Sequence, residues 1–161
     1  MMSKLSRIAR ALVAAGLLVA AGTACAADTE PAPASKDKLA SARSLIAENR
    51  WAAAIDELRR LNEPGSADWN NLMGYSLRKA KTPDYAAAER FYDAALRIEP
   101  QHRGALEYSG ELYLMTGKLG QAEARLAALD KACRMPCEEF TDLKKAVERY
   151  KANGNRYLAA P

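Results

Sequence analysis

The feature that most constrains the fold is a sequence repeat with a period of 34 residues. Within each copy a small residue is followed by a bulky residue four positions later, and then by an apolar residue three positions further on. Residues spaced by three and four lie on one face of an α-helix, so each copy predicts an amphipathic helix. The four columns of the repeat are Ala54, Ala88 and Ala122; Leu58, Tyr92 and Leu126; Leu61, Ala95 and Leu129; and Trp51, Tyr85 and Leu119.

This period and order of residues resemble the tetratricopeptide repeat, a pair of antiparallel helices that stacks on neighbouring pairs. The resemblance covers residues 36–132 and implies an all-α fold: a right-handed superhelical solenoid of three helix pairs plus a C-terminal capping helix. The third copy fits the family pattern best, with Leu106, Gly110, Tyr113 and Gly117 at the expected positions. The second copy has Gly74 two positions early, and the first has Ala42 in place of the glycine. The expected repeats are residues 36–65, 66–100 and 101–132, within a domain at 36–152.

Turn and capping residues predict where the helices of these pairs begin and end. In the first pair we expect helices at residues 36–48 and 51–62. In the second pair we expect Thr82 to cap the second helix and Pro83 to occupy its first helical position. Ala88 should lie where the two helices of this pair cross, and Ala87 should face away from that contact. Trp51, Tyr85 and Tyr92 occupy repeat columns and are expected in the core, whereas Trp69 and Tyr75 are candidates for ligand contact.

The first 26 residues have the pattern of a secretory signal peptide. Lys4, Arg7 and Arg10 precede an apolar run at residues 11–21, and Ala24-Cys25-Ala26 provides a small-residue cleavage site. We therefore expect export to the periplasm, cleavage before Ala27, a soluble mature protein, and a flexible linker rich in proline and alanine at residues 27–35. The alternative is a lipoprotein signal, in which an acylated Cys25 would anchor the protein to a membrane.

Charge and motifs argue against several classes of function. The formal net charge is +4, but three of the basic residues lie in the expected signal peptide, so the mature chain is close to neutral. It has no basic block with interleaved aromatic residues, and nucleic acid is not expected as a partner. The single histidine, His102, has no second ligand at metal-binding spacing, and we expect it to be exposed or to cap a helix. We expect no cofactor and no enzymatic activity.

A stack of helix pairs leaves its last apolar face uncovered, so a helix with a polar outer surface must close it. Residues 137–152 fit this role, because Phe140, Leu143, Val147 and Tyr150 share one stripe. Residues 153–161 are expected to form a tail, in which Asn153-Gly154 ends the helix and residues 156–161 are frayed.

Cys133 and Cys137 lie four residues apart around Pro136, which disfavours a continuous helix through the segment. Export to an oxidising compartment favours a structural disulfide between them. Two alternatives remain open at this point: thiol exchange with a partner, since Cys137 would lie at a helix N-terminus, and binding of a soft metal such as Cu(I) together with Met135.

The family resemblance implies that the first helix of each pair lines a concave binding groove. The residues placed there are Arg43, Asn71, Tyr75, Arg78, Lys79, Glu107 and Glu111. This groove would be basic at one end and acidic at the other, with Arg78 and Lys79 as exposed charges. The predicted function is a non-enzymatic periplasmic scaffold that binds a peptide or helix of another exported protein. The alternative is a thiol-redox or copper-handling accessory protein that uses Cys133 and Cys137.

Overall fold

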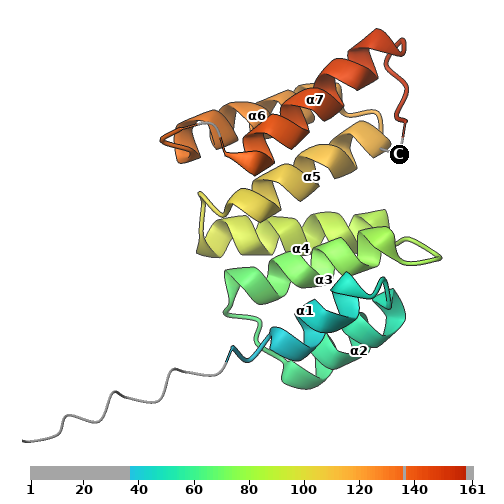
Figure 1. Cartoon of the computed structure of the whole chain (residues 1–161), viewed down its shortest axis with the longest axis vertical. Helices are drawn as coiled ribbons and strands as arrows, with labels where there is room; N and C mark the ends of the chain where they lie inside the picture. The colour runs from blue at the N-terminus through green and yellow to red at the C-terminus, as the bar shows by residue number, and fades with distance from the viewer. Residues whose placement is uncertain (1–36, 136, 159–161) are drawn as a thin grey trace, which may run out of the picture. The chain divides into compact units, whose positions relative to one another are not determined.

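The computed structural model describes residues 37–135 and 137–158, which lie in one compact unit. The expected signal peptide and linker lie outside these residues. Within the described ranges the fold consists of seven α-helices without strands (Figure 1). The helices are α1 (Ala40–Ala47), α2 (Trp51–Leu61), α3 (Ala67–Lys79), α4 (Tyr85–Ile98), α5 (Arg103–Met115), α6 (Leu119–Ala132) and α7 (Glu138–Ala152).

The helices stack in chain order, and each packs against the next (Figure 1). The odd-numbered helices also contact one another in succession, α1 with α3, α3 with α5, and α5 with α7. Over the described ranges the even-numbered helices α2, α4 and α6 make no such contacts with one another. The odd-numbered helices are therefore crowded together on the inner side of the stack. This arrangement confirms the predicted all-α stack of helix pairs and places α1, α3, α5 and α7 along the inner side.

The core consists of three clusters, each formed where neighbouring helix pairs meet. The alanine column of the repeat lies at the centre of the pairs, because Ala54, Ala88 and Ala122 are all 0% exposed. A small residue is also required opposite Ala88. A Cβ atom added at Gly74 would lie 2.8 Å from Tyr92 Cε1 and 3.1 Å from the Ala88 carbonyl oxygen. The 34-residue spacing thus reflects close backbone approach within each pair.

Residues in the left-handed backbone region end three of the helical segments. Asn49 (φ 57°) follows α1, Asn62 (φ 49°) follows α2, and Gly117 (φ 76°) separates α5 from α6. At Gly117 the chain turns tightly, and the next amide, that of Lys118, donates to the Tyr113 carbonyl oxygen at 2.7 Å. Asparagine and glycine adopt positive φ at lower energy than other residues, which explains their presence at these helix ends.

Two predicted helix starts are wrong. The α1 helix begins at Ala40, because the Asp37 carboxylate accepts the Leu39 amide and holds the preceding residues in a turn. The α4 helix begins at Tyr85 and is capped by Asp84, whose side chain accepts from the Ala87 amide at 2.8 Å. Thr82 and Pro83 lie in the preceding turn. An Asp cap also places a negative charge at the positive end of the helix dipole.

Burial differs from the prediction at several alanine and aromatic positions. Ala87 is only 8% exposed, so it is buried although it lies one residue round the helix from Ala88. Trp69 is 7% exposed and its indole nitrogen donates to the Leu58 carbonyl oxygen at 2.7 Å, which makes it a core residue. Tyr92 is fully buried as expected, but Trp51 and Tyr85 are half-buried.

The C-terminal segment is more ordered than expected. Leu143, Val147 and Tyr150 of α7 are buried against α5 and α6, with Phe140 partly buried beside them. After α7 the Asn155 amide donates to the Tyr150 carbonyl oxygen at 2.9 Å, and Tyr157 packs against the same core cluster. The helix ends with Asn153 as its C-cap, as expected, whereas the packing of Tyr157 differs from the predicted frayed tail, and residues 159–161 lie outside the described part of the chain.

Candidate functional site

A cavity of about 390 Å³ opens on the inner side of the stack, where α3, α5 and α7 meet. Its volume is within the range of small-ligand and side-chain pockets. The wall carries five carboxylates but only two cations, Arg78 and Lys79. The lining residues are Tyr75, Arg78, Lys79, Glu107, Tyr108, Glu111, Glu138, Glu139 and Asp142.

Arg78 lines this cavity and contacts one carboxylate and two tyrosine rings. Its side chain is 3% exposed, and Nη1 donates to Glu111 Oε2 at 2.6 Å. The guanidinium carbon lies 5.3 Å from the ring centre of Tyr75 and 5.5 Å from that of Tyr108. These are cation–π distances, and the two rings are themselves in contact, with centroids 4.5 Å apart. Arg78 therefore joins α3 to α5.

This burial corrects one expectation. Arg78 was predicted to be an exposed charge, but its side chain is buried. A buried ion pair that loses one partner leaves the other charge uncompensated, so replacing Arg78 should destabilise the fold. Arg78→Glu would also bring a second carboxylate against Glu111, so it is unsuitable as a binding variant. Lys79 is exposed as expected, and its ammonium group lies 5.9 Å from the ring centre of Trp51.

Glu107 has the most perturbed carboxyl group of the cavity. Burial, followed by the nearby Glu111 and Asp142 carboxylates, raises the pKa of Glu107 from 4.5 to about 8. Arg78 lowers this pKa, but by less than the other groups raise it. Burial and Glu107 in turn raise the pKa of Tyr108 to about 12. A partly desolvated carboxyl group beside other carboxylates is a recognised mark of binding and catalytic sites.

The other carboxylates of the cavity differ in whether a nearby cation neutralises their charge. Glu111 is paired with Arg78, and Glu139 lies 3.6 Å from the Arg103 guanidinium. Asp142 has a Lys145 ammonium group at 3.6 Å, but both side chains are about half exposed, so this pair is weak. Within the described ranges, Glu107 and Glu138 form none of these ion pairs.

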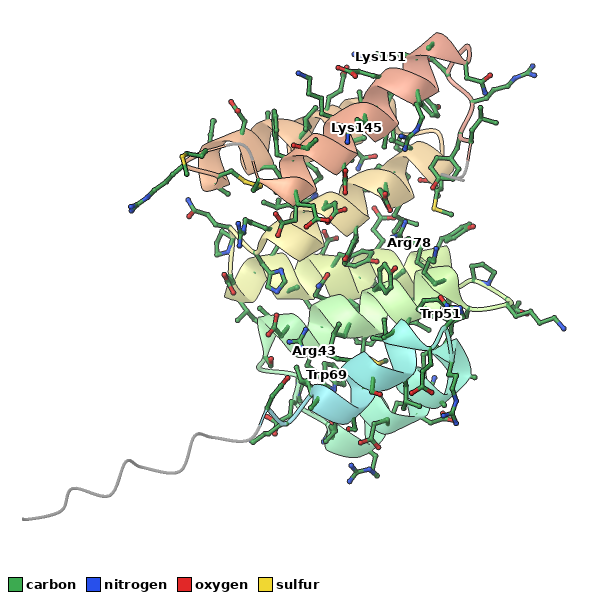
Figure 2. All side chains as sticks on the ribbon, viewed as in Figure 1. Arg43, Trp51, Trp69, Arg78, Lys145 and Lys151 are labelled. Carbon is green, nitrogen blue, oxygen red and sulfur yellow. A yellow bond between two sulfur atoms is a disulfide. The ribbon has the colours of Figure 1, made fainter. Side chains whose placement is uncertain are left out.

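Two of the seven predicted groove residues lie away from the cavity. Arg43 pairs with Asp68 at 2.8 Å, in the first turn of α3. Asp68 and Arg78 are ten positions apart on that helix, about 15 Å at 1.5 Å per residue, and Figure 2 shows Arg43 and Arg78 at opposite ends of α3. Asn71 is 7% exposed, and its amide nitrogen would lie 3.0 Å from a Cβ atom at Gly104, so it packs between α3 and α5.

The other five predicted residues line the cavity, and whether they bind a partner stays a prediction. Sequence reasoning missed the other four lining residues. Tyr108 had a detectable signal, since it lies three positions before Glu111 on one helix face. The remaining three, Glu138, Glu139 and Asp142, come from α7.

His102 is the N-cap of α5, which agrees with the capping role expected for it. Its Nδ1 atom accepts the Ala105 amide at 3.1 Å, and its Nε2 atom lies 2.9 Å from Asp68 Oδ1. A ring nitrogen that accepts from an amide carries no proton, so Nε2 carries the hydrogen and donates to Asp68. The imidazole links α3 to α5 by these two bonds.

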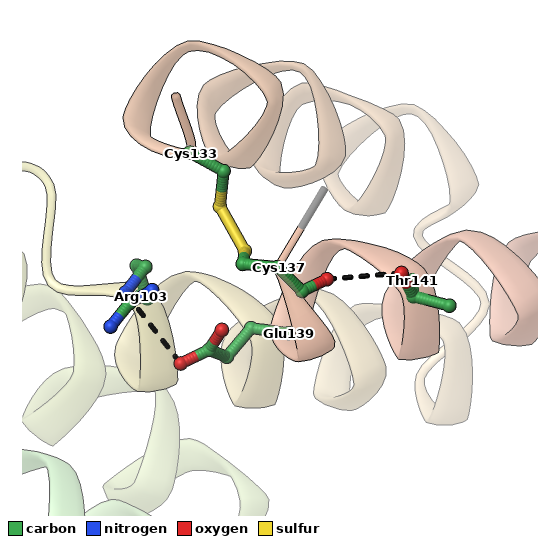
Figure 3. Close-up of a disulfide and its surroundings, with 5 residues drawn as sticks. All are labelled: Arg103, Cys133, Cys137, Glu139 and Thr141. Carbon is green, nitrogen blue, oxygen red and sulfur yellow. Dashed lines mark hydrogen bonds and ion pairs between the residues drawn. A yellow bond between two sulfur atoms is a disulfide. The ribbon is translucent and has the colours of Figure 1, made fainter. Parts of the chain in front are cut away.

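The predicted disulfide is present and joins α6 to α7 (Figure 3). Cys133 is the C-cap of α6 and Cys137 the N-cap of α7. Thr141, one turn into α7, donates its hydroxyl hydrogen to the Cys137 carbonyl oxygen at 3.0 Å. The disulfide therefore fixes the start of α7, which carries Glu138 and Glu139. A disulfide has no thiolate, so the redox and copper alternative would require the reduced form.

No helix in the described ranges combines the length and apolar character needed to span a bilayer. No group of three or more His, Cys, Asp or Glu residues in these ranges has the geometry to hold a metal ion.

Comparison with known proteins gives one positive result. The family model described as the tetratricopeptide repeat matches residues 81–152, the part of the chain that contains α4 to α7. No curated protein matches the chain. The match shows a tetratricopeptide repeat region over α4 to α7, and the stack of helix pairs continues the same arrangement through α1 to α3.

Proposed function

We propose that the protein is an exported scaffold that holds a segment of another exported protein in the cavity between α3, α5 and α7. Tetratricopeptide repeats are protein-interaction modules, and a protein or peptide partner is the general expectation for the family. The observation that carries the proposal is the cavity itself. It lies on the inner side of the stack, and three separate helices contribute to its wall.

The test blocks the cavity with a bulky side chain. Asp142→Trp places a large side chain at the wall, and Asp142 is exposed enough to accept it without disturbing the core. Lys145→Trp is the matched control, because it adds the same side chain one turn along α7, at a 59% exposed position. Proteins captured by the tagged wild type from the export compartment should be lost with Asp142→Trp and retained with Lys145→Trp.

A second pair of variants tests the opposite side of the stack. Arg90 and Arg97 are exposed on α4, an outer helix. Arg90→Glu with Arg97→Glu should leave the captured proteins unchanged. If this double variant loses them while Asp142→Trp keeps them, binding uses the outer side and the proposed site is wrong.

Export belongs to the same proposal and is tested separately. The intact mass of the protein isolated from the periplasmic fraction should correspond to a chain that begins at Ala27 and carries no lipid. A diacylated chain that begins at Cys25 would instead place the scaffold on a membrane surface.

A further inference from the structure

We propose that the cavity between α3, α5 and α7 recognises a lysine or arginine side chain in a basic segment of the partner protein. This inference rests on the proposed function and assigns the chemistry of its ligand.

The first argument is the balance of charge around the cavity. After the Arg78–Glu111 and Arg103–Glu139 pairs are set aside, Glu138 and Asp142 still face the cavity as carboxylates, with Lys79 as the remaining cation of the wall. Glu107 faces the same space, and an entering cation would lower its raised pKa and so bring a third negative charge to the site. A single cationic side chain can contact several carboxylates at once. An anionic ligand would meet their repulsion, because like charges at close distance in a partly desolvated site are unfavourable.

The second argument comes from how the chain binds its own guanidinium group. Arg78 lies beside two tyrosine rings and donates to a carboxylate at 2.6 Å. Tyr75 and Tyr108 also line the cavity, next to Glu107. Tyrosine rings pack well against the methylene groups of lysine and arginine, while carboxylates bind the charged end. The wall thus offers an entering cation the same chemistry that already holds Arg78.

The third argument concerns the kind of cation. Within the described ranges no group of three or more His, Cys, Asp or Glu residues could hold a metal ion. The carboxylates and tyrosine rings of the wall therefore fit a cationic side chain of a peptide segment better than a free metal cation.

The experiment measures binding of three blocked peptides by isothermal titration calorimetry. The peptides have equal length and alternate alanine with lysine, glutamine or glutamate. The lysine peptide should bind most tightly, and its affinity should fall as salt is added. Glu107→Gln combined with Asp142→Asn should weaken it about tenfold, as expected for the loss of two contacts to a partly buried cation.

Glu148→Gln is the matched control for this variant. Glu148 is exposed on the outer surface of α7, and its replacement removes one carboxylate from the same helix without touching the cavity. Affinity for the lysine peptide should remain at the wild-type value. Urea unfolding of each variant shows that lost binding does not come from lost folding.

The outcomes separate this inference from the function on which it rests. If the glutamine or glutamate peptide binds best, and Asp142→Trp abolishes that binding, the cavity is a peptide site but not a cation site. If the lysine peptide binds Asp142→Trp as tightly as wild type, or if no peptide binds, the inference is wrong. In that case the capture experiment with Asp142→Trp and Lys145→Trp still decides the proposed function.

Discussion

Glu107 makes the stability of the folded chain depend on pH. Its pKa is raised from 4.5 to about 8, mainly by burial, so the folded protein keeps a proton that the unfolded chain releases. The stabilisation from this proton is complete below about pH 4.5 and is lost as the pH rises through about 8. Near neutral pH the empty cavity therefore holds Glu107 largely in its neutral form.

Replacing Glu107 with glutamine should remove this dependence. Compared with Glu107→Gln, the wild type should lose free energy of unfolding between about pH 5 and pH 9. Urea unfolding curves of both proteins across this range measure the difference. Glu148→Gln should give a curve parallel to the wild type. Parallel curves for Glu107→Gln as well would show that Glu107 is not desolvated in the folded protein.

Gly74 and Gly120 test the close approach of helices inside a pair. A Cβ atom at Gly74 would press on the Tyr92 ring and on the Ala88 backbone, which cannot move aside. Gly74→Ala should therefore destabilise the protein by about 1–3 kcal/mol. Gly120, in the first turn of α6, has no atom within 4 Å of an added Cβ, and Gly120→Ala should be neutral or stabilise by up to about 1 kcal/mol. Equal urea midpoints for the two variants would contradict this packing.

At the scale of single helices, the disulfide links the end of α6 to the start of α7. Closing so short a loop stabilises the protein by about 2 kcal/mol on an entropic estimate. Replacing both cysteines with serine should lower stability by up to that amount and weaken ligand binding, because Glu138 and Glu139 immediately follow Cys137. Urea unfolding and the lysine-peptide titration measure the two effects.

The native redox state of the pair distinguishes the structural role from the alternatives. Mass mapping after thiol labelling of protein from its own compartment should show Cys133 and Cys137 unlabelled. Reduction by a mild reductant without unfolding would instead favour thiol exchange or metal binding.

The helices were predictable from the sequence because their packing requires small and apolar residues at regular spacings along the chain. The columns at Ala54, Ala88 and Ala122 exist because each pair needs a small residue at its crossing point, and this need recurs every 34 residues. Helix starts were less predictable. Thr82 and Asp84 lie on either side of Pro83, and both residue types can cap a helix. Aspartate is the stronger N-cap of the two, and α4 begins after Asp84.

The cavity was only half predictable, for a different physical reason. The burial of Arg78 depends on Glu111, a residue 33 positions away on another helix. The contributions of Glu138 and Asp142 depend on how α7 is rotated about its axis against α5. The spacing of residues along one helix does not predict how that helix is rotated against its neighbour. It follows from how side chains of α7, such as Leu143, fit against α5.

At the scale of the whole stack, α7 closes the core of the last helix pair. Leu143 is fully buried, and its methyl groups fill the space opposite Gly110, which has no side chain. Leu143→Ala should leave a void that the glycine cannot fill, at a cost of about 2–5 kcal/mol. Lys144→Ala, one residue along and exposed, should change stability by less than about 0.5 kcal/mol. Thermal unfolding followed by circular dichroism compares them, and similar midpoints would mean that α7 is not part of the core.

The position of the cavity also affects how the stack comes apart. Repeat arrays are held by contacts between neighbours, so their ends can open while the rest stays folded. A ligand in this cavity touches α3, α5 and α7 at once and therefore spans segments that could otherwise open separately. Binding should slow amide hydrogen exchange in α3 and α7 together, including at amides that the ligand does not contact. The bound partner would then link neighbouring helix pairs, and the stack would resist opening at its ends most strongly while the partner is bound.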